Sequence, residues 1–236
     1  MGCDRERPAG PLRAARPPAR DRFVEARRVS GTDWTKFRVE RISAATFLKR
    51  NLIHTDLLTA AVRRAKGSLL EVGVGSGAQS ALVSRLVPCT IALDNDPRII
   101  TAARPNLERF GNGVHLVRGD AFALPFADGS FGVAISQGLM EHFDDARIQN
   151  LLREQLRVCN SVVFSVPSDR YPRQDVGDER LMAPMKWLSL VEAAVDTTVY
   201  RAAARYYRFD PESLKYSLHA RRSLGGFSVL VTIDPR

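Results

Sequence analysis

Residues 69–77 read Leu-Leu-Glu-Val-Gly-Val-Gly-Ser-Gly, an apolar run that breaks into three alternate glycines. We interpret the run as a buried strand and the residues from Ala78 onward as a helix. The glycines allow turns and a close approach to a ligand that a side chain would prevent. A helix that starts directly after them presents free N–H groups and the positive end of its dipole. This combination predicts a site for a nucleotide-like ligand, and Glu71 within it favours a ligand with positive charge.

Strand and helix patterns alternate from residue 69 to residue 166. The strands are predicted at 69–72, 90–93, 114–118, 131–136 and 162–166, and the helices at 78–86, 97–110 and 146–159. This alternation predicts a doubly wound α/β fold, in which helices cover both faces of a mostly parallel sheet. Two later strands, at 197–207 and 227–233, flank a predicted helix at 211–224 and are expected to form an antiparallel pair.

Three regions are predicted from the change in composition along the chain. Residues 1–30 are rich in Arg and Pro, and we expect a basic, disordered tail. Residues 31–66 contain amphipathic helical patterns, which end at Gly67, and are expected to form an N-terminal helical cap. The sheet domain is expected to occupy residues 67–236.

The positive charge is concentrated at the N-terminus. Residues 1–66 hold 16 of the 35 Lys and Arg residues but 7 of the 26 Asp and Glu residues, which accounts for the whole net charge of +9. A basic arm of this kind is compatible with nucleic acid, although residues 1–22 lack the aromatic side chains that stack on bases. We therefore favour a solvated tail over a nucleic-acid arm.

Composition also limits the compartment. No apolar run approaches the ~20 residues of a membrane helix, so we expect no membrane partner. The three cysteines, Cys3, Cys89 and Cys159, are far apart and fit a reducing compartment rather than a disulfide framework or a metal site. These features predict a cytoplasmic protein without a bound metal.

Polar residues stand where the predicted strands end. Ligands of open α/β sheets bind beyond these carboxyl ends. Asp94 ends the second strand, where an acidic side chain accepts hydrogen bonds from both ribose hydroxyls of a nucleotide. Asp120 follows the third strand and is predicted to accept from an adenine amine, while the N–H of Ala121 serves a ring nitrogen. Ser136 and Gln137 follow the fourth strand and are expected to face the same crevice.

In this order, the motifs resemble those of the class I S-adenosylmethionine (SAM)-dependent methyltransferases. The resemblance is carried by Glu71-x-Gly-x-Gly-x-Gly, Asp94, Gly119-Asp120-Ala121, Phe126-Ala127-Asp128-Gly129-Ser130-Phe131 and Ser136-Gln137-Gly138-Leu139-Met140-Glu141-His142-Phe143, over about residues 69–167. It is closest to the bacterial group that acts on small molecules. It implies a seven-stranded Rossmann-like sheet with an antiparallel last strand, SAM as the methyl donor and S-adenosylhomocysteine (SAH) as the product.

The resemblance also implies roles for individual residues. Glu71 and the three glycines, Gly73, Gly75 and Gly77, would line the methionine part of SAM, whose sulfonium and ammonium groups suit an acidic neighbour. Asp94 would hold the ribose, and the adenine would contact Asn95, Asp120 and Ala121. Ser136, with Gln137 beside it, would lie near the methionine part or the transferring methyl group.

Methyl transfer depends chiefly on alignment of the acceptor with the activated methyl group. A hydroxyl acceptor also needs a base, and His142 is the candidate because a neutral imidazole takes a proton near pH 7. We expect a small-molecule acceptor, which Trp34 of the cap and Arg170, Tyr171 and Trp187 after the fifth strand would contact. The acceptor atom (oxygen, nitrogen or carbon) and the oligomeric state stay open.

Three other functions compete with this prediction. The basic N-terminus suits a methyltransferase that acts on RNA or protein. Gly73-x-Gly-x-x-Ala78 with Asp94 also fits the dinucleotide fingerprint of a nicotinamide-dependent oxidoreductase, although that function explains neither Glu71 nor Asp120. A non-enzymatic SAM-binding protein would share the cofactor motifs.

Overall fold

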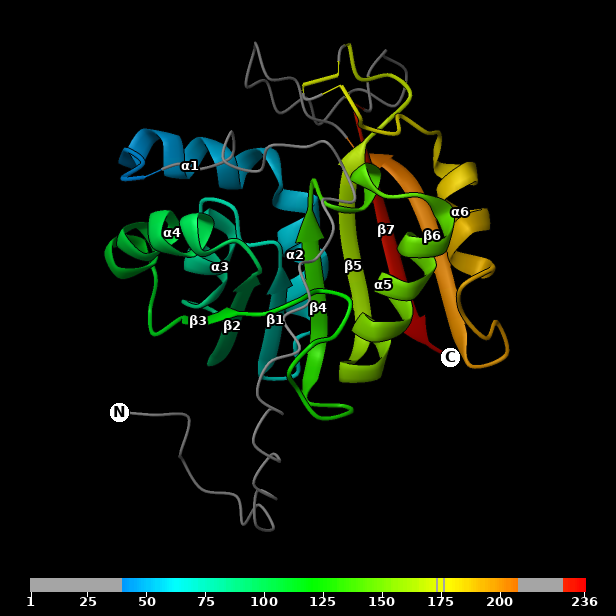
Figure 1. The fold of residues 1–236 in the computed structure, drawn as a ribbon, viewed down its shortest axis with the longest axis horizontal. Coiled ribbons are helices and arrows are strands. Elements are labelled where there is room, and N and C mark those ends of the chain that lie inside the picture. Colours follow the sequence, from blue (N-terminus) through cyan, green and yellow to red (C-terminus); the bar gives the residue numbers. More distant parts are fainter. Residues whose placement is uncertain (1–39, 173, 176, 208–226) are drawn as a thin grey trace. The chain divides into compact units, whose positions relative to one another are not determined.

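Seven strands form one sheet in the computed structural model, which describes residues 40–172, 174–175, 177–207 and 227–236 (Figure 1). The predicted tail at 1–30, the start of the predicted cap with Trp34, and the predicted helix at 211–224 lie outside the described residues. The strands are β1 (Ser68–Val72), β2 (Cys89–Asp94), β3 (His115–Arg118), β4 (Phe131–Gln137), β5 (Cys159–Pro167), β6 (Tyr200–Tyr207) and β7 (Ser228–Pro235).

The strand order is β3-β2-β1-β4-β5-β7-β6. All pairs from β3 to β5 are parallel, whereas β7 pairs antiparallel with both β5 and β6. The parallel core and the antiparallel late pair agree with the sequence prediction. In Figure 1, the carboxyl ends of β1, β4 and β5 lie at the top, where the yellow loop follows β5.

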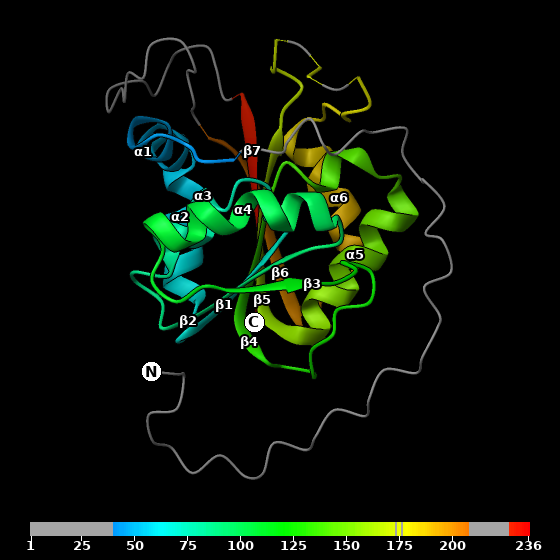
Figure 2. The same cartoon turned by 60° about the vertical axis from the view of Figure 1, so that its left-hand side comes forward.

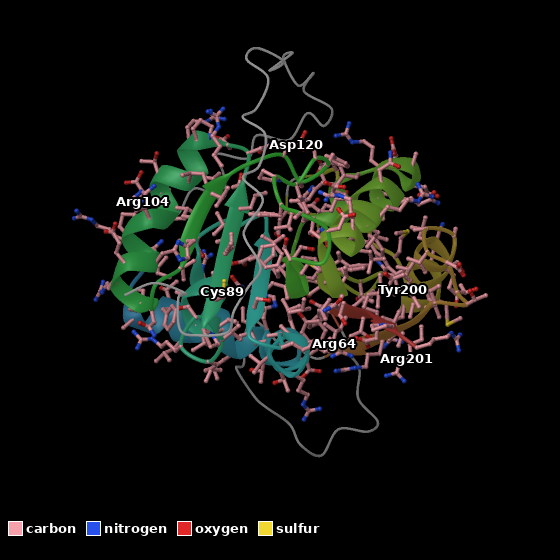
Figure 3. All side chains as sticks on the ribbon, turned by 90° about the horizontal axis from the view of Figure 1, so that it is seen from below. Arg64, Cys89, Arg104, Asp120, Tyr200 and Arg201 are labelled. Carbon is pink, nitrogen blue, oxygen red and sulfur yellow. The ribbon has the colours of Figure 1, made fainter. Side chains whose placement is uncertain are left out.

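Helices cover both faces of the sheet (Figure 2). One face carries α1 (Ala44–Ile53), α2 (Thr55–Arg64), α3 (Ala78–Val83) and α4 (Pro97–Phe110), and the other carries α5 (Asp145–Val158) and α6 (Pro184–Glu192). The helical pattern predicted before the sheet therefore corresponds to α1 and α2. Figure 3 shows Arg104 on the α4 side of the domain and Tyr200 and Arg201 on the β6 side.

Local sequence signals set several of these bounds. Asp96 caps α4 by accepting a hydrogen bond of 2.8 Å from the N–H of Arg98, and Pro97 takes the first helical position. Asp144 caps α5 in the same way through the N–H of Arg147. The helix predicted at 78–86 was too long: α3 ends at Val83, where Ser84 donates its hydroxyl to Ala81. The helix predicted at 146–159 is shifted by one residue, since α5 begins at Asp145 and Cys159 belongs to β5. The strand predicted from residue 197 begins only at Tyr200, because residues 196–199 form a turn in which the N–H of Tyr200 donates to Asp196.

The sequence patterns did not predict α6, and this corrects the proposed role of Trp187. Its side chain is fully buried and meets the ring of Phe164 edge-on, with 5.7 Å between the ring centroids. Trp187 therefore packs in the core between α6 and β5, and its predicted contact with an acceptor is wrong. No helix among the described residues has the length and apolar character required to traverse a membrane.

Candidate cofactor and acceptor site

The glycine loop after β1 takes its shape from three left-handed residues. Gly73, Gly75 and Gly77 have φ values of 83°, 50° and 76°, which side chains disfavour. A Cβ atom at Gly77 would lie 2.8 Å from Leu107 of α4, whereas one at Gly75 would meet no atom within 4 Å. The loop therefore packs tightly against α4 at Gly77 and leaves open space beside Gly75.

Two side chains hold this loop in place. The guanidinium of Arg50 in α1 donates to the hydroxyl of Ser76 over 2.9 Å. The amide of Asn106 in α4 donates to the Ser76 carbonyl over 3.0 Å and accepts from the N–H of Ile42 over 2.9 Å. Sequence reasoning missed both residues, because they lie 26 and 30 positions from Ser76 and belong to no local motif.

Glu71 is buried directly below the loop, with 2% of its surface exposed. One carboxylate oxygen accepts the N–H of Ser80 over 3.1 Å and also the Ser80 hydroxyl. Burial raises the pKa of Glu71 to about 7, and the charge of Asp94 acts in the same direction. The protein thus holds a carboxyl group that a nearby positive charge would stabilise in its ionised form. Ser80 is a third residue that the sequence analysis missed.

A Glu71→Gln variant is expected to change how stability depends on pH. The pKa of Glu71 is about 4.5 in the unfolded chain and about 7 in the folded protein, so the native state retains a proton that the unfolded state has lost. Wild-type stability should therefore fall as pH rises from 4.5 to 7, by about 3 kcal/mol from this group alone. Urea denaturation at pH 5 and pH 8 should show a smaller fall for the variant. Equal falls in the two proteins would contradict the raised pKa.

Asp94 at the end of β2 faces the same loop. The backbone N–H of Asp96 donates to its carboxylate over 3.0 Å, and that of Gly75 also donates to it. Burial raises the pKa of Asp94 above its usual value. Asn95 is exposed, and its carbonyl accepts from Arg118. The structure thus brings the predicted residues Glu71, Gly75 and Asp94 together around one space.

The turn after β3 lies next to Asp94. Gly119 donates its N–H to the Asp94 carbonyl over 2.9 Å, and Asp120 accepts the N–H of Phe122 over 2.9 Å. Asp120 is exposed, as the labelled side chain in Figure 3 indicates, and Ala121 is half-buried. The predicted adenine contacts thus stand beside the predicted ribose contact.

Ser136 and Gln137 close β4 next to β1. Ser136 is 1% exposed, and within the described residues its hydroxyl oxygen has no hydrogen-bond partner. Gln137 is half-buried. A buried hydroxyl without a partner costs free energy, which a polar group of a ligand would recover.

His142 lies in a short 3-10 helix, η2 (Met140–His142), after β4. Its Nδ1 atom is 2.7 Å from a carboxylate oxygen of Asp178, which belongs to the loop after β5. Glu141 beside it is 2% exposed, and burial raises the pKa of that carboxyl group to about 8. The sequence analysis assigned no role to Asp178, since it lies 36 residues from His142.

The predicted acceptor residues Arg170 and Tyr171 occupy the start of that same loop. The guanidinium of Arg170 lies 3.8 Å from the ring centroid of Tyr206, and the hydroxyl of Tyr171 donates to Asp175 over 3.0 Å. Both therefore already contact residues of their own chain, and their contact with an acceptor stays a prediction.

The chain is similar to known methyltransferases. Residues 69–161 match a family described as "Methyltransferase domain". A protein-L-isoaspartate O-methyltransferase of Bradyrhizobium sp. (strain ORS 278) is 26% identical over 48% of this chain and 58% of its own length. The ribosomal RNA small subunit methyltransferase H of Trichormus variabilis is 31% identical over 44% of this chain and 35% of its own length. The chain thus spans less than two thirds of either relative.

A solved structure from Thermotoga maritima, described as a SAM-dependent methyltransferase and possible histamine N-methyltransferase, shares the fold. Its TM-score is 0.55 at 17% identity, over 80% of this chain and 94% of that one. This chain therefore has the same fold as that structure. The match over residues 69–161 and the shared fold both point to methyltransferases that use SAM, which implies SAM as the cofactor.

Proposed function

We propose that this protein transfers a methyl group from SAM to a small organic acceptor. The observation that carries the proposal is the convergence of Glu71, Gly75, Asp94 and Ser136 at the carboxyl ends of β1, β2 and β4. The buried hydroxyl of Ser136 has no hydrogen-bond partner in the part of the chain that the structure describes. A buried acid, an open space beside a glycine and an unsatisfied hydroxyl fit a ligand that carries both positive charge and polar groups. SAM, when bound, supplies a methyl group already activated by its sulfonium.

The residues of this chain bind and orient the cofactor. Asp94 accepts the ribose hydroxyls, and Asp120 and Ala121, with Asn95 nearby, contact the adenine. Glu71 acts on the methionine part, where the positive charges of SAM favour its ionised form. Gly73, Gly75 and Gly77 leave the loop without side chains where the cofactor would bind. Ser136 and Gln137 would lie near the methionine part or the transferring methyl group of SAM.

His142 is the residue that we propose to act on the acceptor. Asp178 fixes one nitrogen of its ring, an arrangement that orients imidazoles in catalytic and metal-binding sites. His142 would activate the hydroxyl or amine of the acceptor in one of two ways. It would either take the acceptor's proton or hold a second group that lowers the pKa of the acceptor. Arg170, Tyr171 and Trp34 are proposed to contact the acceptor, with α1 and α2 as part of a cap over the site.

Methyl transfer to RNA or protein is the second candidate. The curated relatives act on such substrates by name, and residues 1–66 carry the excess positive charge. The small-molecule acceptor is preferred because residues 1–22 lack aromatic side chains for base stacking.

Isothermal titration with SAM, SAH and reduced nicotinamide dinucleotide tests the proposal. We expect micromolar binding of SAM and SAH and none of the nicotinamide. The protein would then be incubated with SAM and panels of hydroxyl compounds, amines, RNA and protein, and SAH formation would be measured. Binding of the nicotinamide alone would overturn the cofactor, and SAH formation only with RNA or protein would overturn the small-molecule acceptor.

A further inference from the structure

We propose that η2 and the loop after β5 bind one divalent cation through His142, Asp178 and Glu179. Each of the three offers one ligand atom, and these atoms all lie within 4.8 Å of one another. His142 and Glu179 are buried and Asp178 is half-buried. One imidazole with carboxylates suits first-row divalent ions such as Mn²⁺ and Zn²⁺. Sequence analysis expected no metal because it considered only the cysteines.

Glu141 supplies an independent observation that points to a cation. Its carboxylate is 2% exposed, and within the described residues its Oε2 atom has no hydrogen-bond partner. The Oε1 atom of the same carboxyl group lies 4.0 Å from Nε2 of His142, so Glu141 borders the candidate site. A buried carboxyl oxygen without a hydrogen-bond partner costs free energy, and a bound cation would offset that cost.

The surrounding hydrogen bonds hold the candidate ligands in place. Arg180 donates its backbone N–H to the Glu141 carbonyl over 2.9 Å, and its guanidinium donates to the Phe143 carbonyl over 3.0 Å. The N–H of Gly177 donates to the carboxylate of Glu179 over 2.9 Å. The loop is thus attached to η2 on both sides of His142, and the site is formed by two segments that are distant in sequence.

The cation would define the acceptor class, and this step rests on the proposed function. The site follows β4 by a few residues, after Ser136 and Gln137, which we propose to lie near the methionine part or the methyl group of SAM. A divalent cation lowers the pKa of a hydroxyl that approaches it. The acceptor would then be an alcohol or phenol. Its oxygen forms the bond to the methyl carbon, the carbon–sulfur bond breaks with its electron pair going to sulfur, and the hydroxyl proton passes to solvent.

Binding of Mn²⁺ to the full chain tests the site. The protein would be stripped with a chelator, dialysed and titrated with Mn²⁺, with the free ion measured by electron paramagnetic resonance. We expect one equivalent to bind, and Zn²⁺ to displace it. His142→Ala and Asp178→Asn should each weaken binding at least tenfold, and Glu179→Gln should do the same. Asp175→Asn, which alters an exposed acid of the same loop, should bind Mn²⁺ like wild type.

Circular dichroism establishes that each variant is folded, and SAH titration runs in parallel. A folded wild-type protein that binds neither Mn²⁺ nor Zn²⁺ would overturn the site, as would unchanged binding in all three ligand variants. If SAH binds and the metal does not, the cation site fails and the proposed function stands. If the metal binds and SAH does not, the site stands and the proposed function fails.

Discussion

Replacing Asp94 by alanine is expected to weaken the binding of SAM and SAH by about 10²- to 10⁴-fold. The carboxylate would accept two ribose hydroxyls, and each hydrogen bond to a charged group contributes about 1.5–3 kcal/mol. Asp96, two residues away, is engaged with Arg98 and is not expected to replace this acceptor. Isothermal titration of wild type and variant with SAH measures the difference.

Two companion variants separate binding from folding. Asp94→Asn keeps one oxygen for the N–H groups of Gly75 and Asp96 that Asp94 now satisfies, and it should lose affinity less severely than alanine. Asp128→Ala removes an exposed acid that pairs with Arg157 away from the loop, and it should bind SAH like wild type. If Asp94→Ala folds and binds SAH within threefold of wild type, the ribose role of Asp94 is wrong.

Gly132→Ala is expected to cost more than about 3 kcal/mol of folding free energy, since overpacking against fixed backbone strains the fold. Gly132 lies in β4, where an added Cβ would stand 1.9 Å from the carbonyl oxygen of Ala65 and 2.4 Å from its carbonyl carbon. These are backbone atoms at the end of α2, so relief requires the helix to move away from the sheet. Urea denaturation of the two proteins measures the loss.

Gly113→Ala is the matched control. Gly113 has a φ of 72°, yet a Cβ there would meet no atom within 4 Å. Its substitution should lower the folding free energy only by the strain of holding alanine in the left-handed conformation, about 1–2 kcal/mol. If the two variants lose the same folding free energy, α2 moves away from the sheet at little cost. The close contact between α2 and β4 then contributes little to stability.

Local signals predicted much of the fold. Some signals act through neighbouring residues, such as the glycines after β1 and the pair Asp96 and Pro97 before α4. A short stretch of sequence is therefore enough to predict the turn or helix start that they produce. The sequence did not predict α6, because its residues have only a weak helical pattern and because Trp187 packs against a strand that is distant in sequence. Strand bounds shifted by a few residues wherever pairing partners, rather than side-chain alternation, decide where a strand ends.

The candidate site shows the same difference between residues that local sequence predicts and residues that it does not. Glu71, Asp94 and Asp120 were predicted because strand ends of a parallel sheet meet at one edge. Arg50, Ser80 and Asp178 were not, since their partners are set by how helices and loops fold over that edge. Single-sequence patterns carry little information on such contacts between distant segments.

The position of β7 has a consequence for the order in which the domain assembles. β7 follows β6 in the chain, yet it lies between β5 and β6 and provides the sheet pairing of both. During synthesis, β1 to β5 can associate as soon as they leave the ribosome, whereas β6 has no strand to pair with until β7 emerges. The nascent protein therefore exposes the edge of β5 for that interval, a period in which a chaperone or a second copy of the chain can compete for it.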